Sequence, residues 1–132
     1  MTDQPPARYL ALTERARREA PTAPAANIKA VEYTINCLPD DDLDSHLFEI
    51  RVQYRGAGRY AVIRNGSCLG IDGTWDQGIK EYDRGQKWLD NHRFDLYTAL
   101  CLAQEQAPLV TVNGHTVTDA LAMRAQRAAR DA

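Results

Sequence analysis

The sequence lacks the features that mark several specialised classes of protein. Its cysteines are few, odd in number and about thirty residues apart, at Cys37, Cys68 and Cys101. This spacing fits neither a disulfide framework nor a CxxC metal motif, so we expect small, buried apolar side chains. No apolar run reaches the roughly 18 residues of a membrane span, and MTDQPPARYL lacks the apolar stretch of a signal peptide. We therefore predict a cytoplasmic protein that does not enter a membrane.

An excess of charge of one sign is also missing. The 132 residues include 16 Lys and Arg against 18 Asp and Glu, a net charge of −2. DNA binding through phosphate contacts usually requires a strongly basic surface, which the chain as a whole does not supply. The sequence also has no Walker-type phosphate loop and no GxSxG nucleophile elbow. It therefore indicates no cofactor and gives catalysis little support.

The features that are present divide the chain into two parts. Residues 1–27 are typical of a helix followed by a Pro/Ala linker, PTAPAAN. From residue 28 the hydrophobic period becomes two, in VEYTINCL, FEIRVQY and RYAVIR, as in half-buried strands. The turn segments RGAG, NGS and DG connect the later strands too tightly for a parallel crossover. We predict a single α+β domain over residues 28–132, with an antiparallel β-meander of four to six strands packed against an amphipathic helix.

Two helices are predicted after this sheet. The first has Asp95 as its N-cap, ends near Pro108 and covers one face of the sheet with an apolar stripe. The second begins at an approximate capping box formed by Thr116 and Asp119. The stripe of the first helix consists of Leu96, Ala99, Leu100 and Ala103. The second helix is expected to bury Val117, Leu121, Ala125 and Ala128 and to expose Arg124, Arg127 and Arg130.

Residues 76–92 show no clean period and contain two glycines and many charges. We predict a long loop here, with at most a helical turn at residues 86–90. Long loops in compact domains are uncommon unless they bind a ligand or partner, and aromatic and arginine side chains are enriched in interface hot spots. We therefore predict a small non-catalytic accessory or regulatory protein that binds another protein through Tyr82, Trp88 and Arg84. Homodimerisation stays open.

Two strings extend this interpretation to a family. GRYAVIRNGSCLGIDGTWD and WLDNHRFDLYTALCLAQEQAPLVTVNGHTVTDAL together resemble a group of small uncharacterised proteins of actinobacteria and their phages. The shared features are the aromatic residue of the RYAV strand, the CL hairpin ending in DGTWD, the HRFDL helix start and the VNG turn. The resemblance covers roughly residues 48–122. It implies a small accessory protein of phage or prophage origin and carries no assigned activity.

Nucleic-acid binding is an alternative function. Arg51, Arg55 and Arg59, with Arg64 as a further candidate, are interleaved with Tyr54 and Tyr60 on one predicted hairpin. Arginine combined with aromatic faces often holds single strands. Against this, residues 28–76 contain five Lys and Arg but eight Asp and Glu. Any basic surface there is local.

A small hydrolase-like enzyme is a second alternative, with a site near Asp72, Asp76 and His92. Two carboxylates beside an aromatic residue, here Trp75, are one arrangement for acid/base chemistry on sugars. The pair Asp72–Gly73 is also the expected composition of a type I′ turn. The acidic run at residues 40–44 lacks the spacing of a calcium loop, so we predict a solvated loop and no metal site.

Overall fold

The computed structural model describes residues 24–77 and 85–131. The predicted N-terminal helix falls outside these residues. Five antiparallel strands form one sheet in chain order, and a second sheet pairs β6 with β7. The strands of the large sheet are β1 Glu32–Ile35, β2 Ile50–Tyr54, β3 Tyr60–Arg64, β4 Ser67–Leu69 and β5 Trp75–Gln77. The predicted α+β class and the antiparallel meander are confirmed.

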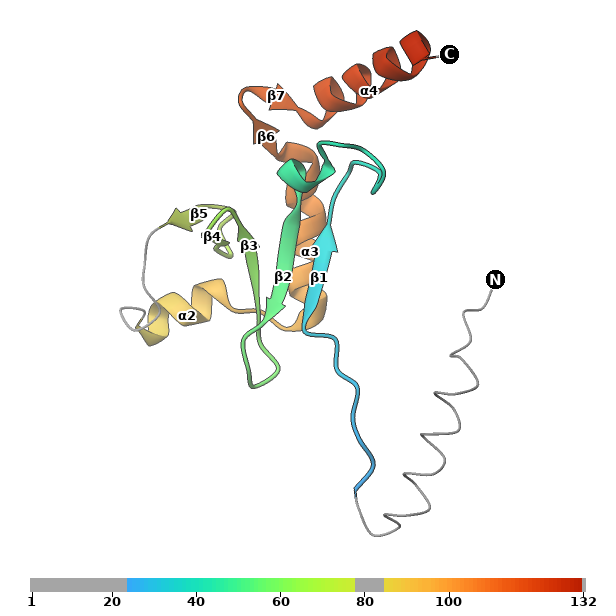
Figure 1. The fold of residues 1–132 in the computed structure, drawn as a ribbon. Helices are drawn as coiled ribbons and strands as arrows, with labels where there is room; N and C mark the ends of the chain where they lie inside the picture. Colours follow the sequence, from blue (N-terminus) through green and yellow to red (C-terminus); the bar gives the residue numbers. More distant parts are fainter. Residues whose placement is uncertain (1–23, 78–84, 132) are drawn as a thin grey trace.

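One face of the large sheet carries the hydrophobic core. Val52 and Val62 are register partners, and because side chains alternate along a strand, Ile50 lies on the same face as Val52. These three residues and Leu69 are fully buried. Helix α3, Leu96–Gln106, packs on this face against β2 and β3 (Figure 1). Burial of apolar surface between the helix and the sheet is the main force that holds these layers together.

Helix α3 follows its sequence signals closely. Its N-cap Asp95 accepts a hydrogen bond of 2.8 Å from the backbone N–H of Thr98. The helix ends at Gln106, and a 3-10 turn, Ala107–Leu109, follows with Pro108 in it. The predicted apolar stripe is confirmed. Its members Ala99 and Ala103 are fully buried, and Leu96 and Leu100 pack against the core.

Asn-Gly pairs make two of the tight turns. Asn65 and Gly66, between β3 and β4, have φ angles of 51° and 77°. Strands β6, Thr111–Val112, and β7, His115–Thr116, are joined in the same way by Asn113–Gly114. Two positive φ angles in a two-residue loop are the signature of a type I′ turn.

The predicted type I′ turn at Asp72–Gly73 is wrong. Only Gly73 has a positive φ, of 85°. The chain instead forms a longer loop over residues 70–74, in which the N–H of Gly70 donates to the carbonyl of Thr74 at 2.8 Å.

The predicted long loop over residues 76–92 is partly wrong. Strand β5 extends to Gln77, and helix α2 spans Gln86–His92. A helix of two turns is too short to show a hydrophobic period, which explains the error. Asp76 lies on the face of β5 opposite Trp75 because side chains alternate, and its carboxylate accepts from α2. These contacts attach α2 to β5.

The buried side of helix α4, Val117–Asp131, differs from the predicted one. Val117 and Ala120 are buried, whereas Leu121 is 40% exposed. The alanines predicted to be buried, Ala125 and Ala128, are exposed as well. Beyond its first turns the helix extends away from the sheet (Figure 1). No helix in residues 24–77 and 85–131 combines the length and apolar character required to cross a membrane.

The acidic run explains this orientation. Arg124 of α4 lies 3.0 Å from Asp41, and Arg127 lies 3.8 Å from Asp42 and 3.6 Å from Asp44. Asp42 is only 5% exposed, so the prediction of a fully solvated loop is wrong. Arg124 and Arg127, which were expected to point outward, face these carboxylates instead.

The cysteines were predicted to be buried, and one of them is not. Cys68 of β4 is buried and Cys101 of α3 is partly buried, but Cys37 is exposed. Cys37 lies just after the end of β1, where the alternating burial of the strand no longer applies.

Candidate functional site: an arginine pocket between the β2–β3 hairpin and α2

The predicted protein-binding residues fall partly outside the structure. Tyr82 and Arg84 lie outside the described residues, whereas Trp88 is on α2 and half-buried. The indole N–H of Trp88 donates to Asp76 Oδ2 at 3.0 Å, and its ring stacks on that of His92 with centroids 3.9 Å apart. Trp88 is thus held by the fold as well as partly open to a partner.

The residues of the predicted hydrolase-like site do come together. His92 Nε2 lies 2.8 Å from Asp76 Oδ2, and Nδ1 lies 2.7 Å from the carbonyl oxygen of Trp88. Since a carbonyl oxygen only accepts, Nδ1 donates to it. Nε2 faces the Asp76 carboxylate, so both ring nitrogens of His92 are engaged within the fold, and neither points at an open position where a general base would act.

Asp72 stands at the mouth of a cavity of about 330 Å³ beside this pair. Its pKa is lowered, chiefly because its carboxylate accepts from the hydroxyl of Thr74 at 2.7 Å and from the backbone N–H of the same residue at 3.0 Å. The hydroxyl of Thr74 donates to that carboxylate, and the base expected to activate a nucleophile, His92, is engaged at both nitrogens. The cluster resembles a structural network more than an acid/base site.

The residues predicted to bind nucleic acid do not form one surface. Arg51 lies on the sheet face opposite the core and donates to Glu49 at 2.8 Å, a bond that raises its pKa. Tyr60 is 8% exposed and belongs to the core, so its ring offers little surface for a base to stack on. Arg55 and Arg59 are exposed at the other end of the hairpin.

Arg55 and Arg59 instead line a pocket of about 540 Å³ together with Arg93. The pocket lies between the β2–β3 hairpin and α2. Its remaining lining residues are Gly56, Gln86, Leu89 and Asp90. Among the described residues, the pocket therefore combines three guanidinium groups, one carboxylate and one aliphatic side chain.

Backbone geometry brings two of the arginines together in the hairpin. The N–H of Arg55 donates to the carbonyl of Arg59 at 2.8 Å, which places the two residues opposite each other at the base of the turn. The three residues between them, Gly56, Ala57 and Gly58, all have positive φ angles. Glycine adopts this conformation readily, so RGAG is well suited to hold the turn.

An isolated β-bridge between Tyr60 and Phe94 positions the third arginine, Arg93, at the pocket. The N–H of Tyr60 donates to the carbonyl of Phe94 at 2.7 Å, and the N–H of Phe94 donates back at 2.9 Å. This bridge places Arg59 and Arg93, the residues that precede each partner, beside the same pocket. Arg93 itself is 8% exposed, and it donates to the carbonyl of His92 at 2.9 Å.

Arginines outnumber carboxylates among the described residues that line the pocket. The one carboxylate among these described residues, Asp90, accepts from the side-chain amide of Gln86 at 2.7 Å. Arg59 also lies near Asp95, whose pKa is lowered first by the backbone N–H of Thr98 and to a smaller extent by Arg59. Arg55 and Arg59 are both exposed, so an anion that enters the pocket meets two cationic groups there.

Sequence reasoning identified Arg55 and Arg59 but missed Arg93 and Leu89. Both lie far along the chain from the hairpin, in a segment without a hydrophobic period. The sequence signal nearest to Arg93 is the RFD string before α3. Nothing in that string indicates that Phe94 forms a β-bridge with Tyr60.

No family model, curated protein or solved structure was found to match this chain. The resemblance to small proteins of actinobacteria and their phages stays a prediction. Within residues 24–77 and 85–131, no group of three or more His, Cys, Asp or Glu side chains is arranged to hold a metal ion.

Proposed function

We propose that this protein is a non-catalytic binding protein that holds an acidic segment of a partner protein in the arginine pocket. The observation that carries this proposal is the convergence of Arg55, Arg59 and Arg93 on one cavity. Tyr82 and Arg84, which precede α2 in the chain, remain predicted contacts of the same partner. The proposal keeps the predicted accessory role and assigns it to a defined pocket.

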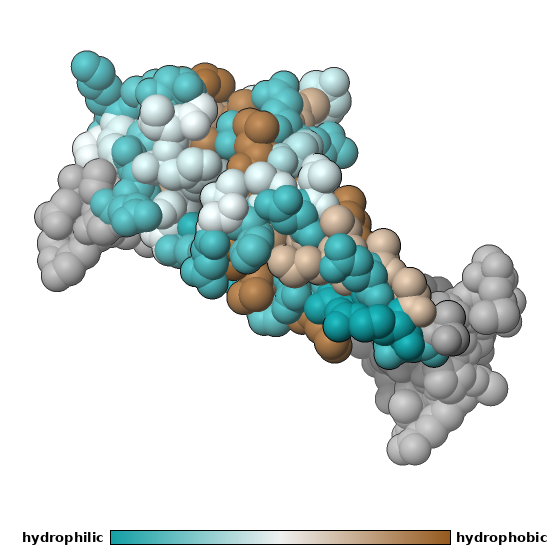
Figure 2. All heavy atoms as spheres, turned by 90° about the horizontal axis from the view of Figure 1, so that it is seen from above, coloured by the Kyte–Doolittle hydropathy of each residue, from teal (hydrophilic) through white to brown (hydrophobic). Residues whose placement is uncertain are grey.

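The chemistry of the lining supports an acidic side chain as the ligand. Guanidinium groups bind carboxylates through two parallel hydrogen bonds, which are shorter and stronger than neutral ones. Leu89 supplies an apolar wall for the aliphatic stem of a glutamate. At the opposite end of the molecule, the face around α4 is mostly polar and its hydrophobic residues form separate spots (Figure 2).

A nucleic-acid strand fits these observations less well. Strand binding requires several cationic groups along a groove and exposed aromatic faces. Here Arg51 is paired with Glu49, and Tyr60 is buried. A single pocket is better suited to one anionic side chain than to a run of phosphates.

Fluorescence polarisation of a labelled peptide of alternating glutamate and leucine tests the proposal. The full chain is compared with Arg59→Glu and with Arg130→Glu, a matched control that makes the same charge change on the exposed end of α4. We expect Arg59→Glu to weaken peptide binding at least tenfold, because it removes charge-assisted hydrogen bonds worth about 1.5–3 kcal/mol. Arg130→Glu should leave the affinity nearly unchanged.

Two outcomes would contradict the proposal. Equal loss in both variants would show that binding depends on net charge alone. A labelled single-stranded oligonucleotide that binds more tightly than the peptide, with the same dependence on Arg59, would favour the nucleic-acid alternative.

A further inference from the structure

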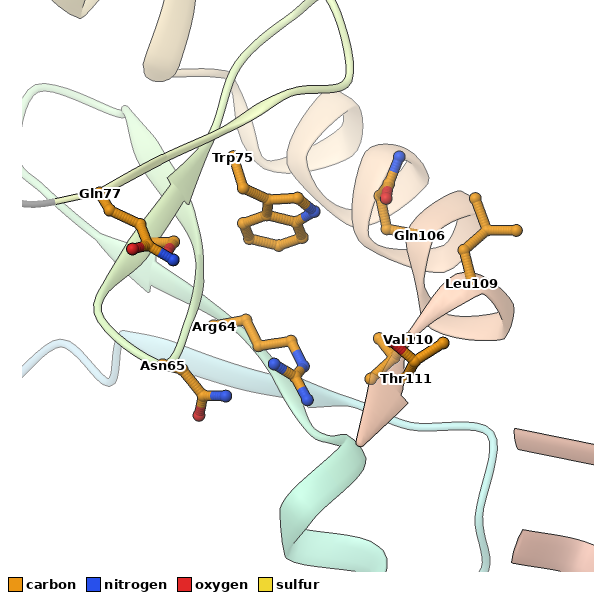
Figure 3. A pocket seen from close by; sticks show the side chains of 9 residues that line it. Arg64, Asn65, Trp75, Gln77, Gln106, Leu109, Val110 and Thr111 are labelled. Carbon is orange, nitrogen blue, oxygen red and sulfur yellow. The ribbon is translucent and has the colours of Figure 1, made fainter. Parts of the chain in front are cut away.

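A second cavity, of about 330 Å³, opens where β3–β5 meet the end of α3. Figure 3 shows Arg64 and Trp75 on the side of the sheet, with Gln106 and the segment that leads into β6 across from them. The lining residues are Arg64, Asn65, Ser67, Trp75, Gln77, Gln106, Leu109, Val110 and Thr111. None of them lines the arginine pocket, so this site is independent of the proposed function.

Arg64 brings an unbalanced positive charge to this cavity. Its side chain is half-buried, and its Nη2 donates to the carbonyl of Leu47 at 2.9 Å, which fixes the guanidinium in place. Among the described residues no carboxylate lies within ion-pair distance of it, and its Nε is buried without a hydrogen-bond partner. A half-buried cation without a counter-ion attracts an anion more strongly than a fully hydrated one does, so an anion at this position would be favoured.

Trp75 provides a flat apolar wall next to that charge. It is half-buried on the core face of β5, where it is the register partner of Leu69. Its indole ring borders the open space above Arg64 (Figure 3). Indole rings are good stacking platforms for planar heterocycles.

Side-chain amides are also part of the cavity lining. Asn65, Gln77 and Gln106 all line the cavity. An amide offers both a donor and an acceptor, the combination that the edge of a nucleobase requires. The lining thus supplies an aromatic surface for stacking, amides that can hydrogen-bond to the edge of a base, and a guanidinium group for an anion.

We propose that this cavity binds a nucleoside monophosphate, with its base on Trp75 and its phosphate at Arg64. Small-molecule sites usually occupy about 300–1,000 Å³, and this cavity lies at the lower end of that range. It therefore suits a single nucleotide. The same chemistry is present in a free mononucleotide and in the terminal nucleotide of a single strand.

Isothermal titration of the full chain with the four ribonucleoside 5′-monophosphates tests the site, with inorganic phosphate and the unphosphorylated nucleosides as reference probes. Arg64→Gln removes the anion partner, and Arg130→Gln is the matched control on α4. We expect Arg64→Gln to weaken nucleotide binding at least tenfold and Arg130→Gln to leave it unchanged. Trp75→Ala should also cost about tenfold or more, because stacking on an aromatic side chain contributes strongly to base binding.

Since Trp75 also packs against the core, Gln106→Ala provides a variant on the opposite wall that does not disturb the sheet. It should change the preference among the four bases while the thermal midpoint of unfolding stays close to that of the wild type. A 5′-phosphorylated oligonucleotide that binds more tightly than the mononucleotide identifies a strand end as the ligand, and weaker binding identifies the free nucleotide. The proposal is overturned if no probe binds, if inorganic phosphate binds as well as the nucleotides, or if Arg64→Gln has no effect.

Discussion

At the scale of single residues, the Asp76 carboxylate is the junction between the sheet and α2. One of its oxygens accepts from the indole of Trp88 and lies 2.8 Å from His92. Two side chains one helical turn apart thus hold a two-turn helix to a strand. Such a short helix has little intrinsic stability, so its tertiary contacts determine whether it forms.

This network limits what can replace Gly70. A Cβ placed there would lie 2.9 Å from Asp72 Oδ1 and 3.1 Å from His92 Nε2, closer than ordinary contact allows. We expect Gly70→Ala to displace the imidazole from Asp76 and to lower the free energy of unfolding by about 1–3 kcal/mol, as overpacking typically does. Urea denaturation measures the change.

The matched control for that prediction is Gly85→Ala. An added Cβ at Gly85 meets nothing within 4 Å, and its φ of −72° suits any residue. Alanine is a poorer N-cap than glycine, but it also restricts the unfolded chain, so the two opposing effects should leave a small net cost. A Gly70→Ala variant as stable as Gly85→Ala would mean that Asp72 and His92 move aside freely.

At the scale of elements, the two long helices show what a sequence pattern can determine. The stripe of α3 predicted its buried side because no polar partner competes for that helix. The stripe of α4 failed because Arg124 and Arg127 face the acidic run of residues 40–44. That pairing joins segments about eighty residues apart, and nothing in the helix sequence itself reveals it.

The capping box of α4 makes a prediction about pH. Asp119 accepts from the N–H of Thr116 at 3.0 Å, and this hydrogen bond is the main reason that its pKa is lowered. Because the pKa of Asp119 is lower in the folded state, its carboxylate stabilises the folded helix at pH values above the unfolded-state pKa of about 3.9. This stabilisation is lost as the pH falls through the folded-state pKa. Circular dichroism should record a loss of helix in that acid range.

Asp119→Asn is the control, because the amide oxygen of asparagine can still accept from the N–H of Thr116 but does not titrate. Its helical signal should lack the step that the wild type shows below the unfolded pKa. Identical acid profiles for the two proteins would mean that other carboxylates, such as those facing Arg124, govern the attachment of α4.

At the scale of the whole molecule, local sequence signals determined the order of the strands but not the pockets. The meander follows from turns that are short and rich in glycine, which leave each strand beside the next. The arginine pocket depends on the bridge between Tyr60 and Phe94, and the second cavity depends on α3 ending beside Trp75. Both arise from contacts between distant segments, which periodicity does not encode.

The same meander makes one core responsible for the stability of all these parts. Leu69 of β4 is fully buried and belongs to the cluster that joins the sheet to α3, whereas Leu43 in the acidic run is 77% exposed. Leu69→Ala should lower the free energy of unfolding by about 2–5 kcal/mol, a large part of the 5–15 kcal/mol typical of a domain. Leu43→Ala makes the same chemical change with almost no loss of burial, so its thermal midpoint should match that of the wild type. Calorimetry of both variants tests whether the domain has one cooperative core. A single unfolding transition, shifted only by Leu69→Ala, indicates one core. Two transitions would mean that the described elements unfold separately.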